Sequence, residues 1–326
     1  MVSRASTAEK LATGAGLSPS NKPSRLFSVA KRQDLIAGYL FVLPVILGIL
    51  FWVLIPMVLS LYYSFTNNSI IGSYHFIGLE NYKTLFQSPT FIQSLQVTFI
   101  YVFISVPLNL LVGLVIAVLL NQRVLGMRVF RTLFYLPVVV PPVAGTLLWN
   151  DMFSASQYGV VNSILLSLHL VKTPFPFFTE PSTAMFSFIV MGLWSAGGSM
   201  LIWLAGLKSV PVELYEAARV DGASSWKRFL LITIPLITPT IFFNMIMGMI
   251  GAFQTFTTSF VLGGVTGSPL GALDLINVYI YRHAFSYFQM GFASAAAWVL
   301  FAITFVFSLV LFLTSGRWVI YRGEVE

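Results

Sequence analysis

The sequence predicts an all-α integral membrane protein, a bundle of six transmembrane helices. Of its 326 residues, 57% are hydrophobic and only 9% are charged, and the mean hydropathy is +0.86. Soluble domains carry about 25% charged residues, so this chain cannot build an ordinary water-exposed surface. Six apolar runs without Asp, Glu, Lys or Arg have the roughly 17 to 25 residues or more that cross a bilayer as a helix. The runs are 36–65, 97–120, 132–148, 184–207, 234–262 and 292–313.

The first run follows a polar stretch rich in Ser and Lys. That stretch is too long and dispersed for the charged start of a signal peptide. The run itself is too long for the apolar core of a signal peptide, so we expect an uncleaved span. We expect residues 1–33 to form a flexible cytoplasmic tail and residues 34–314 the transmembrane domain. Residues 315–326 are expected to form a second cytoplasmic tail.

The third run contains Pro137, Pro141 and Pro142. Proline lacks a backbone N–H and kinks helices, so we expect a bent span that packs against protein. Residues 160–168 are apolar but too short to cross a bilayer, and we expect them to lie near the outer interface. A transmembrane β-barrel would show short segments of alternating polarity instead of long apolar runs.

The basic residues predict the orientation of the chain. All but three of the 18 Lys and Arg residues lie in the two tails or in the connections after the second and fourth runs. Cytoplasmic connections carry the excess of positive charge, so both termini are expected to be cytoplasmic, and an even number of spans requires the same. The net charge of +7 is therefore a signal of topology, and no nucleic-acid partner is expected.

No catalytic or metal centre is expected. The chain has no cysteine, and His75, His169 and His283 lie far apart in the external connections. For each histidine, anchoring or hydrogen bonding is a better explanation than metal or acid–base chemistry. Neither an HExxH nor a GxSxG motif is present, so the sequence does not favour an enzyme.

The connection between the fourth and fifth runs, residues 208–233, predicts a helix, a sharp turn and a second helix. Pro211 suits a first helical position, and Gly222 suits the left-handed residue that ends a helix. Ser224 or Ser225 is suited to cap the next helix. Small side chains in the first helix leave room for the backbone of another protein, and a neighbouring carboxylate is expected to face solvent. These residues are Glu216, Ala217 and Ala218.

The order Glu216-Ala217-Ala218, then Gly222, then Ile232 and Ile234-Pro235 resembles the EAA loop of binding-protein-dependent ABC importer permeases. Ile234 stands where that pattern usually has leucine. The resemblance implies the type I ABC importer permease fold and a coupling helix that docks on a cytosolic ATPase. It implies ATPase-coupling roles for Glu216, Ala217, Ala218, Asp221 and Gly222. A basic loop attracted to anionic lipid would explain the cations but not this spacing.

Residues 76–82 and 281–285 resemble those of sugar-importer permeases, and among these the MalF-like and UgpA-like subunits of the inner membrane. The resemblance implies a second related permease subunit, two copies of an ABC ATPase, an extracytoplasmic solute-binding protein and a carbohydrate substrate. No lysine follows a glycine in the chain, so a phosphate-binding Walker A motif is missing. We therefore expect no cofactor here, with ATP and Mg²⁺ bound by the partner ATPase.

The fifth run also predicts a substrate pathway. Asn244, Gly248, Gly251, Thr255 and Thr258 follow one another at spacings of three and four, which place them on one helical face. Gln254 flanks this face, and the fourth run offers Ser195 and Ser199. Close helix packing is an equally good explanation for any single one of these residues. Because the six runs carry no charge, we expect a charged substrate to be recognised mainly by the partner proteins.

Two other kinds of membrane protein deserve comparison. An ion- or proton-coupled secondary transporter would place a carboxylate or histidine inside a span, and none of the six runs contains one. A membrane scaffold without transport would need neither the helix–turn–helix connection nor the polar face of the fifth run. The sequence therefore favours an ATP-driven importer that works by alternating access.

Overall fold

The computed structural model describes residues 25–69, 75–122 and 124–320, with side chains from residue 35 onward. Of the described residues, 77% are helical, and these ranges contain no named strand, so the all-α prediction is confirmed. Helix α1 (Arg25–Ile49) begins before residue 33, so the end of the expected flexible tail is helical. Residues 1–24 and 321–326, which cover the rest of the two expected tails, lie outside the described residues.

Among the described residues, five helical segments are long and apolar enough to cross a membrane: Leu35–Ser64, Pro89–Leu120, Pro181–Ser209, Thr238–Thr266 and Met290–Ser315. The third predicted run instead forms α5 (Met127–Val139) and α6 (Pro142–Met152), which are bent by 101°. Val140 and Pro141 between them have extended backbone, and prolines on either side cannot continue the hydrogen-bond ladder. The count reaches the predicted six if this bent pair is one span.

The chain divides into two compact units, one up to Leu59 and one from Ser60 onward. The first unit holds α1, the π-helical turn η1 (Leu50–Leu54) and the start of α2 (Ile55–Ser64). Pro56 lacks the N–H that would bond the carbonyl four residues earlier, which accounts for the wider π turn beside it. No residue in the apolar window of this span is buried, as expected for a surface that meets lipid or another chain.

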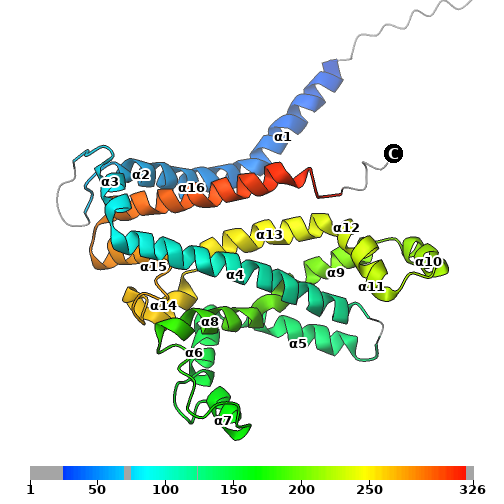
Figure 1. Ribbon diagram of the computed structural model, residues 1–326. Coiled ribbons are helices and arrows are strands. Elements are labelled where there is room, and N and C mark those ends of the chain that lie inside the picture. The colour runs from blue at the N-terminus through cyan, green and yellow to red at the C-terminus, as the bar shows by residue number, and fades with distance from the viewer. Residues whose placement is uncertain (1–24, 70–74, 123, 321–326) are drawn as a thin grey trace, which may run out of the picture. The chain divides into compact units, whose positions relative to one another are not determined.

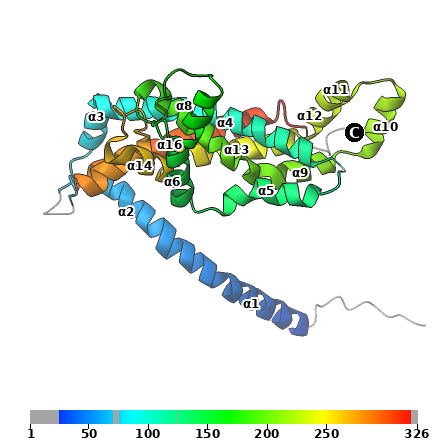
Figure 2. The same cartoon turned by 90° about the horizontal axis from the view of Figure 1, so that it is seen from below.

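In the second unit, α4 (Pro89–Leu120) is the central helix. It packs against α13 (Thr238–Phe253), α9 (Met200–Ser209) and the 3₁₀ segment η2 (Leu193–Ser199), and α16 (Met290–Ser315) lies on the far side of α13 (Figure 1). Figure 2 shows the same helices running side by side after a quarter turn. Phe253 and Trp203 are fully buried, and each belongs to a different apolar cluster between these helices.

The fourth and fifth spans are segmented, which the sequence did not predict. The fourth consists of α8 (Pro181–Gly192), η2 and α9. The fifth begins with α12 (Ile234–Leu236), continues as α13 and breaks before α14 (Thr257–Gly263) and η4 (Gly264–Thr266). At that break the Asn277 amide donates hydrogen bonds to the carbonyls of Phe253 and Thr255, at 2.8 and 3.2 Å. A side chain far along the sequence thus satisfies backbone groups that the helix would otherwise pair.

The connections that we expected to be external contain α3 (Glu80–Gln87), α7 (Val160–Ser167), α15 (Ile276–Tyr281) and the π turn η5 (Arg282–Ser286). Helix α7 coincides with the predicted short segment. At the C-terminal end of the described residues, the backbone N–H of Ile320 donates to Thr238 Oγ1 at 2.9 Å, and Val319 is buried. The described part of the expected C-terminal tail is therefore packed on the start of α13.

Candidate functional site

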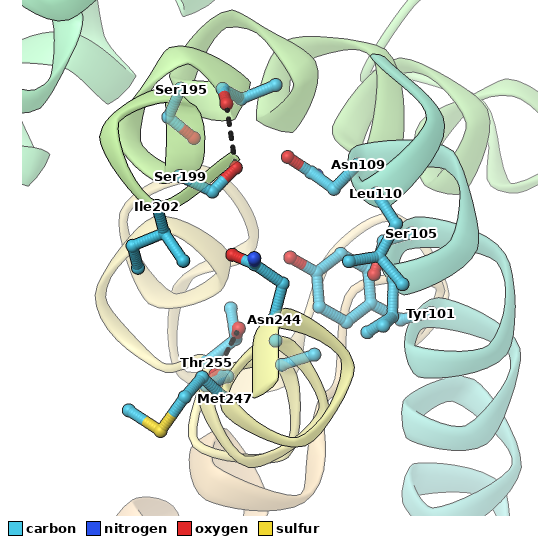
Figure 3. A pocket seen from close by; sticks show the side chains of 15 residues that line it. Tyr101, Ser105, Asn109, Leu110, Ser195, Ser199, Ile202, Asn244, Met247 and Thr255 are labelled. Atoms are coloured by element: carbon cyan, nitrogen blue, oxygen red, sulfur yellow. Dashed lines mark hydrogen bonds between the residues drawn. The ribbon is translucent and has the colours of Figure 1, made fainter. Parts of the chain in front are cut away.

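A cavity of about 370 Å³ lies among α4, the η2–α9 region and α13 (Figure 3). Its polar lining consists of hydroxyl and amide side chains, and no charged side chain lines it. Six of the eight predicted pathway residues line this cavity. They are Ser195, Ser199, Asn244, Gly248, Gly251 and Thr255. Figure 3 shows Ser195 and Ser199 on one side and Asn244 on another, so the fourth and fifth spans both contribute to the wall.

The other two predicted pathway residues lie elsewhere. Thr258 lines a neighbouring cavity of about 430 Å³, and Gln254 lines neither of the two. The predicted face requires one unbroken helix, whereas α13 ends at Phe253 and α14 starts at Thr257. Positions beyond residue 253 therefore leave the common face, although Thr255 lines both cavities.

Helix α4 supplies a third wall that the sequence reasoning missed. Tyr101, Ser105 and Asn109 line the first cavity, and Figure 3 shows them on the same helix. They are spaced by four residues, so they share one face of α4. This spacing was visible in the second apolar run, as polar side chains recurring every fourth residue in an apolar segment.

The second cavity adjoins the first, because Tyr101, Asn109, Ser195 and Thr255 line both. Its wall is richer in aromatic side chains and includes Phe188, Trp149 and Trp194. The two indole rings form an edge-to-face pair with centroids 5.9 Å apart. No charged side chain lines this cavity either. Together the two cavities offer neutral hydrogen-bonding groups beside aromatic side chains.

The predicted helix–turn–helix is present as α10 (Val212–Val220), a turn at Gly222 and α11 (Ser225–Arg228). We call the segment Val212–Arg228 the coupling elbow. Pro211 precedes the first helical residue rather than occupying it. Gly222 has φ +75°, and its N–H donates to the Arg219 carbonyl while that of Ala223 donates to the Ala218 carbonyl. This paired arrangement is the Schellman motif, which favours glycine at the left-handed position.

The coupling elbow is exposed to its surroundings. Glu216, Ala217, Asp221 and Gly222 are exposed, while Ala218 is half-buried. Val220 and Trp226 are 88% and 68% exposed, which leaves apolar surface beside the charged groups. Ser224 accepts a hydrogen bond from the Lys227 N–H at 3.3 Å and so caps α11. An exposed helix with an apolar surface and small side chains is suited to contact another protein.

A buried ion pair in the connection between the fifth and sixth spans was missed by the sequence reasoning. Arg282 donates to both carboxylate oxygens of Asp274, at 3.1 and 2.8 Å, and to the Val265 carbonyl at 2.9 Å. Ser94 of α4 donates to the same carboxylate at 2.8 Å. The two charged side chains are only 9% and 8% exposed. Arg282 is thus neutralised within the fold and lines neither cavity.

His283 adjoins this pair. Its Nδ1 lies 2.8 Å from Gln289 Oε1, and its ring centroid lies 4.4 Å from that of Tyr279. Burial lowers the pKa of His283 below its ordinary value of 6.5 and outweighs the opposite effect of the hydrogen bond to Gln289. The folded state therefore favours the neutral form of the His283 imidazole.

Comparison with known proteins places this architecture in one family. The family model of the "binding-protein-dependent transport system inner membrane component" matches residues 109–318. The probable ABC transporter permease protein YesP of Bacillus subtilis is 42% identical over 297 residues, which cover 90% of this chain and 95% of YesP. The trehalose/maltose transport system permease protein MalF of Thermococcus litoralis is 33% identical, over 90% of this chain and 98% of that protein.

A solved structure gives the same result. A chain in the crystal structure of a bacterial alginate ABC transporter, in complex with an alginate pentasaccharide-bound periplasmic protein, superposes with a TM-score of 0.78. It is 27% identical, and the match covers 90% of this chain and 98% of that one. The predicted resemblance is thereby confirmed, and the fold is that of a type I ABC importer permease. The chain belongs to the family of inner-membrane permease components of binding-protein-dependent ABC transporters.

Proposed function

We propose that the chain is the permease subunit of an ATP-driven importer that moves a carbohydrate across the inner membrane by alternating access. The observation that carries this proposal is the uncharged cavity, in which hydroxyl and amide groups from α4, η2 and α13 converge. Such groups pair with the hydroxyls of a sugar without the cost of desolvating a charge. The aromatic wall of the second cavity suits the apolar face of a sugar ring.

The substrate class is supported by relatives of similar length. Three relatives are named as transport system permeases for lactose, for trehalose and maltose, and for arabinooligosaccharides. The solved alginate transporter imports an acidic polysaccharide. In this chain neither cavity is lined by a charged side chain, and Arg282 is engaged by Asp274. For an acidic sugar, recognition of the charge would therefore fall to the solute-binding protein or to a second permease subunit.

The coupling elbow is the proposed contact with the ATPase. Glu216 would meet a cation of the ATPase, while Ala217 and Ala218 would allow its backbone to approach. Asp221 and Gly222 would hold the turn that follows. In this scheme two ATPase subunits bind ATP with Mg²⁺, a second permease completes the pathway, and a loaded solute-binding protein docks outside.

The proposal is tested in proteoliposomes that contain the complete transporter, the solute-binding protein and ATP. Glu216→Lys reverses the charge at the proposed contact, and Gly222→Pro is incompatible with the observed φ of +75°. Each variant should insert and purify normally but lose most of its carbohydrate uptake and of the ATP hydrolysis stimulated by the binding protein. Asp151→Lys, an exposed charge reversal at the end of α6, is the matched control.

Two results would overturn the proposal. One is full uptake by both elbow variants. The other is a wild-type complex that imports none of the neutral oligosaccharides or uronic acids offered with its own binding protein.

A further inference from the structure

We propose that the hydrogen bond between Tyr215 and Thr233 transmits movement from the coupling elbow to the fifth span. The Tyr215 hydroxyl lies 2.8 Å from Thr233 Oγ1, so it joins the middle of α10 to the π turn η3 (Phe229–Thr233). The inference rests on the proposed function, because it assigns the contact through which the ATPase would act on the pathway. Both residues are positioning residues, since neither lines a cavity beside the sugar path.

The contact matters because the turn at Gly222 has no Cβ that restricts its backbone angles. Gly222 adopts φ +75°, and a Cβ built on it would meet nothing within 4 Å. A displacement of α10 could therefore be absorbed by rotation at this turn before it reaches α11. The bond between Tyr215 and Thr233 joins α10 directly to η3, at the start of the fifth span. It bypasses the turn at Gly222.

Thr233 lies at the start of the fifth span, which is divided into short helical segments. Thr233 is 5% exposed and ends the π turn, in which the Ile234 N–H donates to the Phe229 carbonyl. Pro235 has no N–H for the Leu231 carbonyl, which accounts for the widened turn. The Thr238 hydroxyl donates to the Pro235 carbonyl at 2.7 Å. Because a few specific hydrogen bonds hold the start of the fifth span, this start can pivot, whereas a regular helix resists bending.

Beyond this pivot the structure is closely packed up to the cavity. Ile237 is 1% exposed in an apolar cluster against which the Tyr215 ring also packs. Helix α13 starts at the next residue and carries Asn244 into the cavity wall. Gly206 of α9 leaves no room for a Cβ against the Thr240 side chain, so α9 and α13 are in close contact. A push on Thr233 would therefore move both segments that line the cavity.

The test measures uptake and ATP hydrolysis in the same proteoliposomes. Tyr215→Phe and Thr233→Val each remove one hydroxyl and keep the shape of the side chain. Each should lower the number of sugars imported per ATP hydrolysed by about fivefold, the factor expected for one hydrogen bond. The double variant should fall no further, because both changes delete the same contact. Tyr82→Phe is the matched control, since it removes a 2.8 Å bond to Ser64 on the external side.

Melting temperatures separate this role from a structural one. A bond that only stabilises the fold would lower the melting temperature of both variants and leave the ratio of uptake to hydrolysis unchanged, and that result would overturn the inference. Additive losses of the ratio in the double variant would overturn it as well. Failure of the proposed function can be distinguished from failure of this inference, because the wild-type complex itself would then not import.

Discussion

Replacing Arg282 with methionine tests whether the buried ion pair holds the connection between the fifth and sixth spans in place. The change removes three donated hydrogen bonds and keeps most of the aliphatic length of the side chain. Asp274 would then remain buried, with Ser94 as its one donor side chain among the described residues. The Val265 carbonyl would also lose the hydrogen bond that Arg282 gives it.

The expected loss follows from the burial of both partners. Their side chains are 9% and 8% exposed, so water cannot replace the missing partner. Removing one member of a buried pair costs about 3–5 kcal/mol of folding stability. In a chain of this size 1 kcal/mol corresponds to roughly 2 °C, so Arg282→Met should lower the melting temperature by about 6–10 °C. Replacing both partners, as in Asp274→Leu with Arg282→Met, should recover much of the loss because no charge is left unpaired.

The assay is thermal unfolding of the detergent-purified chain, followed by intrinsic fluorescence at neutral pH. Lys83→Met, at an exposed position in α3, is the control for removal of a cation and should change the melting temperature little. The reasoning is refuted if Arg282→Met melts within about 2 °C of the wild type. It is also refuted if the double variant is as unstable as the single one, because the cost would then not come from an unpaired charge.

Two further predictions concern pH and topology. The pKa of His283 is lowered in the folded state, mainly by burial, so the unfolded chain takes up a proton first as pH falls. The melting temperature should therefore decrease as pH falls from about 6.5 through the lowered pKa. The variant His283→Asn should lose part of that dependence. An unchanged pH profile in this variant would contradict the role assigned to His283. Because the chain has no cysteine, Val220→Cys and Tyr158→Cys, at positions 88% and 84% exposed, can report topology. An impermeant maleimide should label Tyr158→Cys in intact spheroplasts and Val220→Cys only after permeabilisation, and the reverse pattern would contradict the proposed cytoplasmic termini.

The helical fold was predictable because charge is expensive in a bilayer. Long runs without a charged residue identified five spans and the bent α5–α6 pair, and the prolines at positions 137, 141 and 142 predicted the bend. The coupling elbow was also predictable, since Gly222 and Ser224 act through local backbone chemistry. In each case a few neighbouring residues determine the conformation.

The parts that could not be predicted depend on residues far apart in the sequence. The break after Phe253 contains no proline, and the Asn277 amide satisfies its free carbonyls from outside the helix. The sequence reasoning therefore kept Thr258 on the same face as Asn244, although it lines the other cavity. The pairing of Asp274 with Arg282 likewise depends on how the external connection folds against α4.

The distribution of charge suggests how work is divided in a transporter of this kind. In the described part of the chain, the one ion pair is buried in the connection between the fifth and sixth spans, whereas the cations and carboxylates of the coupling elbow form no ion pair with each other. The cavities between these regions are neutral. A neutral lining presents hydroxyls and amides that pair with many sugars, so it discriminates weakly among them. Selectivity would then lie in the solute-binding protein, and the uncompensated charges of the elbow would be left to recognise the ATPase.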